Sequence, residues 1–283
     1  MTYLNPDALV STDWLGEHLN DPTVRVIDCS WHQPVFKRDA VAEFADVHIP
    51  GAAYFNIDDI ADASSSLPHM IPDAAKFSER VGKLGIGNDH HVIAYDVAGF
   101  GSAARVWWMF RLFGHDKVSV LNGGLPKWRA ENRASASGAA TPQAAAFKAQ
   151  KNDGLVRSVE HVLRNLEKPT EQVLDARSAG RFNATEAEPR KGLRGGHIPN
   201  SFSRPFNDLY DSESKTMKSA DDLIALFDEA GVSRDEPIVT SCGSGVTACN
   251  LALGLYLIGK TDVAVYDGSW TEWGGRDDTP IDP

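Results

Sequence analysis

The chain has 283 residues, of which 42% are hydrophobic and 24% charged, and its formal net charge is −11. This length allows one large domain or two of ordinary size, and the composition is typical of a soluble globular protein. The negative charge argues against nucleic acid and anionic membrane surfaces as partners. An anionic substrate would therefore need a local basic patch.

Cysteine usage and the N-terminal sequence bear on the compartment. Cys29, Cys242 and Cys249 are odd in number and lack metal-ligand spacing, so they predict neither a disulfide framework nor a metal site. The first residues show no basic segment followed by an apolar core, and no stretch is long enough to span a membrane. We therefore expect a protein of the reducing cytoplasm, without a membrane anchor.

The first half of the chain alternates predicted helices and strands. Such alternation predicts a parallel sheet with helices on both faces. Apolar periodicity, capping residues and terminal glycines place a helix at 11–18, a strand at 24–28, a helix at 73–84, a strand at 92–95, a helix at 102–113 and a strand at 118–121.

An Ala- and Ser-rich segment at 134–150 is typical of a linker, and after it the same order of signals returns. The repeat predicts an α/β protein with two tandem domains: a non-catalytic one at 1–133, a linker at 134–154 and a catalytic one at 155–283. In the second copy Ser158 caps a helix, and there follow a strand at 173–175, a helix at 219–230, a strand at 238–241, a helix at 248–258 and a strand from 263.

Several features of the repeat indicate structural roles. His48 and His197 occupy matching His-Ile-Pro positions in both halves, so we expect their rings to fix turns. The pair Trp107-Trp108 and the tryptophans Trp270 and Trp273 are expected to pack in the core. The terminal segment 277–283 is expected to be a solvated tail.

The loop Cys242-Gly-Ser-Gly-Val-Thr247 lies where a strand ends and a helix begins. Gly243 and Gly245 allow it to curl so that backbone N–H groups surround the group that Cys242 carries, and the start of the helix favours a thiolate. The loop predicts a nucleophilic cysteine in an anion cradle; the alternative is a small buried cysteine. Asp96 stands at the matching place in the first half, which excludes thiol chemistry there.

This loop resembles the active-site loop of 3-mercaptopyruvate sulfurtransferases, which are two-domain members of the rhodanese family. The resemblance covers nearly the whole chain and implies two rhodanese-like domains. It also implies that the transferred sulfur rests on Cys242 within the loop formed by Gly243, Ser244, Gly245, Val246 and Thr247. No cofactor is implied.

Five basic residues lie between 177 and 194: Arg177, Arg181, Arg190, Lys191 and Arg194. The arginine fork suits a small carboxylate substrate, but Glu186 and Glu188 also fit an ordinary solvated loop, and the residues alone leave both possibilities open. The family that the chain resembles binds the substrate carboxylate and carbonyl with the arginines of a Gly-Arg-Phe and a Glu-Pro-Arg motif. Those arginines correspond to Arg181 and Arg190.

Asp58 and His69 form a second constellation, in the first domain. A lone histidine in a Ser-rich loop is more commonly a surface residue. The resemblance implies instead that Asp58 orients His69, and that His69 reaches Ser244 across the domain interface to form a proton relay.

The resemblance implies that Cys242 takes the sulfur of 3-mercaptopyruvate, releases pyruvate and passes the sulfur to a thiol or cyanide. Thioredoxin or another dithiol is the protein acceptor that it implies. Cys249 and Cys29 are expected to be buried structural thiols.

Three other functions remain as alternatives. A thiosulfate sulfurtransferase typically has basic residues after the cysteine, where this chain has Gly243 and Ser244. A cysteine phosphatase would need an arginine at Ala248. A non-catalytic rhodanese-like binding module would lack the cysteine, as Asp96 shows in the first half.

Overall fold

A computed structural model describes residues 2–283. Its first half consists of η1 (Pro6–Ala8), β1 (Leu9–Val10), α1 (Thr12–His18), β2 (Val24–Asp28), η2 (Pro34–Phe36), α2 (Ala40–Asp46), β3 (Ala53–Tyr54), α3 (Ile57–Ile60), α4 (Ala74–Lys83), β4 (His91–Tyr95), α5 (Ala103–Leu112), β5 (Val118–Leu121) and α6 (Gly124–Ala130).

The second half repeats this plan. It consists of η3 (Asp153–Leu155), β6 (Val156–Arg157), α7 (Val159–Glu167), β7 (Gln172–Asp175), α8 (Ala179–Phe182), β8 (Phe202–Ser203), η4 (Phe206–Leu209), α9 (Ala220–Glu229), β9 (Ile238–Ser241), α10 (Ala248–Leu257), β10 (Ala264–Tyr266) and α11 (Ser269–Trp273).

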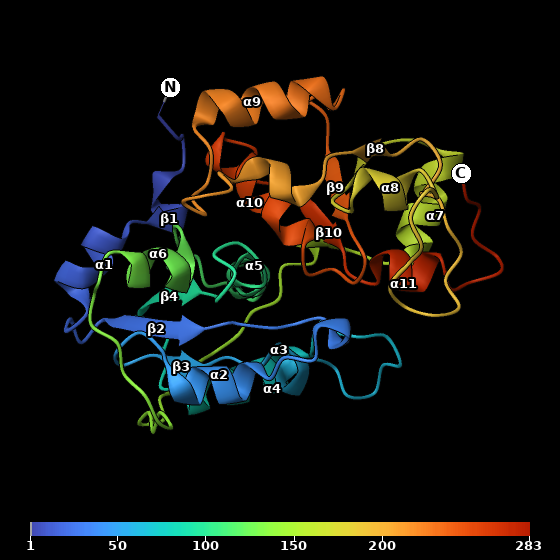
Figure 1. Cartoon of the computed structure of the whole chain (residues 1–283). Coiled ribbons are helices and arrows are strands. Elements are labelled where there is room, and N and C mark those ends of the chain that lie inside the picture. The colour runs from blue at the N-terminus through green and yellow to red at the C-terminus, as the bar shows by residue number, and fades with distance from the viewer. Residues whose placement is uncertain (1) are drawn as a thin grey trace.

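Each half forms one five-stranded parallel sheet flanked by helices (Figure 1). The strand order is β1-β5-β4-β2-β3 in the first sheet and β6-β10-β9-β7-β8 in the second. The two orders agree strand for strand, which confirms the predicted tandem α/β repeat. In both sheets the middle strand, β4 or β9, leads directly into the loop that holds Asp96 or Cys242.

The predicted helix starts agree with the observed caps. The Ser11 side chain accepts a hydrogen bond from the backbone N–H of Trp14, and Asp73 caps α4 in the same way. Ser158 and Ser219 cap α7 and α9. A side-chain oxygen at each start satisfies one of the N–H groups that a helix leaves without an intrahelical partner.

Helices α5 and α10 pack against each other in the middle of the molecule and join the two halves (Figure 1). α10 is apolar on nearly every side because it lies between its own sheet and α5. The rings of Trp107 and Tyr256 meet edge to face across this contact, with centroids 5.3 Å apart. One apolar core therefore includes residues of both halves.

The segment after the first sheet contains no regular helix or strand between 134 and 150 in the described chain, in keeping with the predicted linker. This segment is nevertheless held against the first domain. Ala136 pairs with His48 through two backbone hydrogen bonds, and the Phe147 side chain is buried beside Phe110. The positions at which one domain ends and the next begins stay a prediction.

The expectation of a solvated tail at 277–283 was right only in part, because residues 277, 278, 280, 282 and 283 are exposed but the segment is held by specific contacts. Asp282 pairs with His197 through backbone hydrogen bonds, and Thr279 is buried. Arg194 donates hydrogen bonds to the carbonyl oxygen and the hydroxyl of Thr279. These contacts hold an acidic segment that hydropathy alone assigns to solvent. Within residues 2–283, no helix has the length and apolar character needed to cross a bilayer.

Candidate active site

The loop after β9 is anchored by the neighbouring strand end. The Ser269 hydroxyl accepts hydrogen bonds from the backbone N–H groups of Cys242 and Gly245, each at 3.1 Å. The backbone N–H of Trp270 donates to the Cys242 carbonyl oxygen at 2.9 Å. Gly245 adopts φ +74°, which favours glycine. Because β10 lies beside β9 in a parallel sheet, its carboxyl end delivers these anchors to the cysteine.

The loop offers N–H groups that are available to a ligand. Among the described residues, no hydrogen-bond acceptor is found for the backbone N–H groups of Gly243, Ser244, Val246 and Thr247. In the first half, the equivalent loop is filled: the Asp96 carboxylate accepts four backbone N–H groups at 2.8 to 2.9 Å, from Ala98, Gly99, Gly101 and Ala103. In the first half, therefore, backbone N–H groups at the matching place in the repeat surround a carboxylate.

Burial alone does not distinguish Cys242 from the other cysteines, because all three side chains are buried. Burial raises the pKa of Cys29, and the nearby carboxylates of Asp28 and Asp96 raise it further. Burial also raises the pKa of Cys249, whose Sγ donates a hydrogen bond to the Gly245 carbonyl oxygen. Cys249 interacts electrostatically with Arg105, and Cys242 with Arg190. What distinguishes Cys242 is its place at the start of the glycine loop that follows β9.

Two guanidinium groups flank Gly243. A Cβ placed on Gly243 would lie 3.0 Å from Arg181 Nη2 and 3.8 Å from Arg190 Nη1. Arg190 Nη2 donates a hydrogen bond to Ser244 Oγ at 3.3 Å. Burial lowers the pKa of Arg190, and the positive charge of Arg181 contributes to the same shift. The structure thus places both predicted arginines at the mouth of the cysteine loop.

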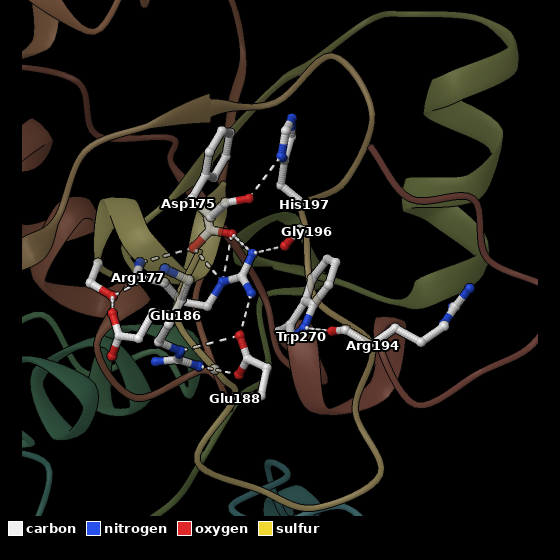
Figure 2. Close-up of polar contacts among 12 residues, drawn as sticks. Asp175, Arg177, Glu186, Glu188, Arg194, Gly196, His197 and Trp270 are labelled. Carbon is white, nitrogen blue, oxygen red and sulfur yellow. Dashed lines mark hydrogen bonds and ion pairs between the residues drawn. The ribbon is translucent and has the colours of Figure 1, made fainter. Parts of the chain in front are cut away.

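Arg181 is held by a buried chain of charges, which Figure 2 shows around Arg177. Arg177 pairs with Asp175 at 2.8 Å and with Glu188 at 2.7 Å, and its guanidinium lies 4.0 Å from the centroid of the Trp270 ring. The other oxygen of Glu188 pairs with Arg181 at 2.6 Å. Arg190, by contrast, makes no ion pair with any described residue.

The remaining basic residues of the 177–194 cluster serve other purposes. Arg177 is fully enclosed by its partners and cannot reach a substrate. Arg194 donates hydrogen bonds to backbone carbonyl oxygens at the end of α11 and in the tail. Lys191 is exposed. The carboxylate-binding interpretation therefore applies to two of the five basic residues.

Asp58 and His69 lie together, as predicted. Asp58 Oδ1 accepts a hydrogen bond from His69 Nδ1 at 2.6 Å, and Asp58 Oδ2 accepts one from Trp31 Nε1 at 3.0 Å. Burial raises the pKa of Asp58, but the bonds from His69 and Trp31 lower it more, so the pKa lies below its ordinary value. Since Nδ1 donates to Asp58, the His69 Nε2 atom is the one free to exchange a proton.

The predicted bond between His69 and Ser244 is not present in this structure. His69 Nε2 is buried and has no hydrogen-bond partner among the described residues, and Ser244 accepts from Arg190. The Asp58–His69 pair and the Arg190–Ser244 pair nevertheless lie near each other, since Arg190 interacts electrostatically with both Cys242 and Asp58. The complete relay stays a prediction.

The sequence analysis missed three residues that shape the site, Trp31, Arg105 and Asp267. It also took Glu188 as a sign of a solvated loop, whereas the Glu188 side chain is 3% exposed and pairs with two arginines. Arg105 carried a signal, because an arginine inside the apolar helix Ala103–Leu112 needs a buried partner. Trp31 and Asp267 carried none, because their partners are distant in sequence. His48 and His197 have the expected structural role: each hydrogen-bonds a backbone carbonyl oxygen through Nδ1 and stacks on a phenylalanine.

Comparison with known proteins agrees with this geometry. The rhodanese-like domain model matches the chain twice, at residues 11–131 and 158–276. The chain belongs to the rhodanese family. These two matched segments are the two halves that carry the Asp96 and Cys242 loops.

Several relatives match nearly the whole length of the chain. Human 3-mercaptopyruvate sulfurtransferase is 47% identical over 272 residues, which cover 94% of this chain and 91% of the human one. An Arabidopsis thaliana protein, thiosulfate/3-mercaptopyruvate sulfurtransferase 1, mitochondrial, is 46% identical over 98% of this chain and 78% of its own. The crystal structure of SseA, a 3-mercaptopyruvate sulfotransferase from Escherichia coli, superposes with a TM-score of 0.85 at 40% identity, covering 93% of this chain and 98% of SseA.

Proposed function

We propose that the protein is a sulfurtransferase that moves the sulfur of 3-mercaptopyruvate through a Cys242 persulfide to a thiol or cyanide. The observation that carries this proposal is that the guanidinium groups of Arg181 and Arg190 both lie close to Gly243, in a cysteine loop with no basic residue of its own. Two guanidinium groups suit a carboxylate and its adjacent carbonyl. The activities for which the human relative and SseA are named support the assignment.

The first half-reaction is a displacement at sulfur. The Cys242 thiolate attacks the substrate sulfur, an S–S bond forms, and the C–S bond breaks so that its electron pair stays on carbon. Pyruvate leaves as its enolate and takes up a proton. The persulfide that remains on Cys242 rests among the N–H groups of Gly243, Ser244, Val246 and Thr247, whereas the N–H of Gly245, which was also predicted to bind it, donates to Ser269.

The proton would travel through Ser244 and His69. Asp58 holds His69 Nδ1, which leaves Nε2 for exchange with the Ser244 hydroxyl. This relay needs a hydrogen bond that forms once substrate displaces Ser244 from Arg190, and catalytic hydrogen bonds often tighten only when substrate is bound. Support for the relay is the buried, unpartnered Nε2 atom.

The second half-reaction empties the persulfide. A thiolate of thioredoxin or another dithiol attacks the outer sulfur and regenerates Cys242, and its second thiol then displaces sulfide as a disulfide forms. Cyanide takes the outer sulfur directly as thiocyanate. The reducing cytoplasm is the compartment that we propose, because dithiols are maintained there and all three cysteines are free.

Thiosulfate is the second candidate donor. The Arabidopsis relative is named for both donors, and the unpaired Arg190 would also attract an inorganic dianion. We expect weak thiosulfate activity beside the mercaptopyruvate activity. A purely binding module fits less well, because the position that Asp96 occupies in the first half carries a cysteine, Cys242, in the second.

The test compares kcat/KM for sulfur transfer to a dithiol from 3-mercaptopyruvate and from thiosulfate. Arg190→Ala should reduce kcat/KM for mercaptopyruvate roughly tenfold to a hundredfold, the value of one charged hydrogen bond, and should affect thiosulfate less. Lys191→Ala, which removes the neighbouring exposed cation, is the matched control and should leave both values unchanged. Equal losses on both donors in Arg190→Ala would refute carboxylate recognition.

Cys242→Ser tests the nucleophile itself. The change is small enough for the fold to persist, and a hydroxyl is a far poorer nucleophile towards sulfur, so transfer from both donors should be abolished. Cys249→Ser is the control and should retain transfer. Activity that survives in Cys242→Ser would overturn the assignment of the persulfide to this residue.

A further inference from the structure

Arg105 is a buried cation that contacts both halves of the protein. It lies on α5 in the first half, and its side chain is 1% exposed. Nη1 pairs with Asp267 Oδ1 at 2.6 Å and donates to the Gly245 carbonyl oxygen at 3.2 Å, while Nη2 donates to the His69 carbonyl oxygen at 2.6 Å. One side chain thus joins the loop of His69 to the loop of Cys242.

Asp267 holds the same segment from the second half. It follows β10, and its Oδ2 atom accepts a hydrogen bond from the backbone N–H of Ile71 at 2.8 Å. Arg105 and Asp267 therefore bind the backbone on both sides of Met70. The backbone of His69 itself has φ +62°, a conformation that a residue with a side chain adopts only when its surroundings hold it there.

The ion pair is not needed to dock the two halves, because α5 and α10 already pack through apolar side chains such as Trp107 and Tyr256. A buried ion pair adds little net stability compared with apolar residues of the same volume. The ion pair contributes orientation instead, because the planar guanidinium of Arg105 restricts where the oxygens that it contacts can lie relative to one another. The oxygens fixed here belong to the two loops that carry His69 and Cys242.

The geometry points to Arg105 and Asp267 as positioning residues for sulfur transfer. Their ion pair holds the His69 loop of the first half in register with the Cys242 loop of the second, so that His69 Nε2 can exchange a proton with Ser244. This inference rests on the proposed function, because it assigns His69 a part in the transfer.

The test variant removes both charges together, as Arg105→Met with Asp267→Asn, because the loss of one partner alone would leave an unpaired buried charge. Asparagine keeps an oxygen for the N–H of Ile71. We expect kcat with 3-mercaptopyruvate to fall roughly tenfold to a hundredfold, as for a catalytic group displaced by about 1 Å. KM should change little, because the pair contacts neither Arg181 nor Arg190. Amide exchange over residues 68–71 should become faster.

Two further variants control for folding. Arg111→Met changes the same helix at the same interface, where the guanidinium lies over the Tyr256 ring at 4.1 Å, but it does not touch the His69 loop. It should leave kcat and the exchange of 68–71 unchanged. Arg105→Lys keeps the ion pair but cannot span all three oxygens, so its kcat should be intermediate. It serves as the test if the double variant does not fold.

A double-mutant cycle that combines the Arg105/Asp267 variant with His69→Ala distinguishes this inference from the proposed function. If the pair acts through His69, replacing it in the His69→Ala background should cause little further loss of kcat. A full additional loss, or an unchanged kcat in the folded double variant, would overturn the inference. If His69→Ala itself retains full kcat, the proposed relay fails; amide exchange then decides, because faster exchange at 68–71 supports the positioning role and unchanged exchange refutes it.

Discussion

Glu188 makes the two arginines of the site unequal. It pairs with Arg181 and Arg177 together, whereas Arg190 has no ion-pair partner among the described residues. Arg181 is therefore a fixed, partly neutralised donor, and Arg190 is the cation that a substrate carboxylate can neutralise. Glu188 positions one substrate-binding group while leaving the other available.

Glu188→Gln should raise KM for 3-mercaptopyruvate several-fold, because Arg181 loses the carboxylate that orients it. The free energy of unfolding should fall by about 3 kcal/mol, since Arg177 is then left with an incompletely compensated buried charge. Steady-state kinetics and urea unfolding measure the two effects. Glu186→Gln, which removes an exposed carboxylate nearby, should change neither; a similar rise in its KM would show that the effect is not specific to Glu188.

Asp28 and Asp175 end equivalent strands in the two halves but have different partners. Asp175 pairs with Arg177, whereas position 30 in the first half is a serine whose backbone N–H donates to Asp28. Burial without a cation raises the pKa of Asp28 above its ordinary value. The first half therefore carries a buried carboxylate that is destabilised in its charged form.

Asp28→Asn should stabilise the protein at pH 8. A raised pKa means that the folded state binds the proton more tightly, so the charged carboxylate destabilises the fold above the folded pKa. The advantage of asparagine should shrink as the pH falls through the folded pKa towards the ordinary value of 3.8. Urea unfolding of both proteins between pH 4 and 8 measures it. Asp175→Asn should destabilise instead, and a gain there would contradict the argument.

At the scale of the element, the two glycines of the Cys242 loop have different constraints. Gly245 has positive φ, and a Cβ there would lie 2.6 Å from the Asp267 carbonyl oxygen, which is backbone. A Cβ on Gly243 would meet the ends of flexible side chains, those of Arg181 at 3.0 Å and Arg190 at 3.8 Å. The first glycine keeps space for a guanidinium group, and the second lets the loop turn.

Gly245→Ala should therefore lower the free energy of unfolding by about 1–3 kcal/mol, the cost of a strained backbone conformation, and reduce kcat. Gly243→Ala should leave stability unchanged and raise KM, because Arg181 must move aside. Thermal unfolding and donor titration distinguish the two. If both alanine variants lost the same stability, the distinction between the roles of Gly243 and Gly245 would be wrong.

Long helices were easier to predict from the sequence than very short strands. Helices such as Ala74–Lys83 carry a cap, an apolar period and a terminal glycine, so the sequence located them within a residue or two. Strands such as Ala53–Tyr54 have only two residues and show no period, and they were missed. The site divided in the same way: the Cys242 loop is local and was predicted from its residues, whereas Arg181 and Arg190 needed a family resemblance to be singled out.

At the scale of the whole molecule, the repeat has given one loop geometry two uses. The Asp96 carboxylate occupies the anion site of the first half and accepts four backbone N–H groups. In the second half, Cys242 takes the place of Asp96, and among the described residues the N–H groups of Gly243, Ser244, Val246 and Thr247 have no acceptor. One half is thereby stabilised by an internal anion, and the other is available to a transferred one.

Asp96→Ala should destabilise the protein by about 2–4 kcal/mol, because several buried N–H groups lose a charged acceptor together. Catalysis at Cys242 should persist in the folded fraction. Chemical unfolding measures the loss, and Asp116→Ala, at an exposed position of the same half, is the control. Stability equal to that of the wild type would mean that water replaces the carboxylate at no cost.

Contacts between the halves were the least predictable part. Arg105 and Asp267 are separated by more than half of the chain, and Trp31 and Asp58 meet only after β2 and β3 pair. No local pattern encodes such pairs, because they depend on how complete domains dock. Sequence alone predicted that the halves are equivalent, but not how they share a site.

The closing contacts of the two halves bear on how the protein arose. Trp128 Nε1 donates to the carbonyl oxygen of Ala134, just as Trp273 Nε1 donates to that of Pro280. The His48–Ala136 bridge likewise matches the bridge between His197 and Asp282. A gene duplication that copied one domain together with the segment that follows its last helix accounts for both matches. On this view the first part of the connecting segment is not a spacer inserted between two copies, because residues 134–136 and 280–282 are two copies of one stretch.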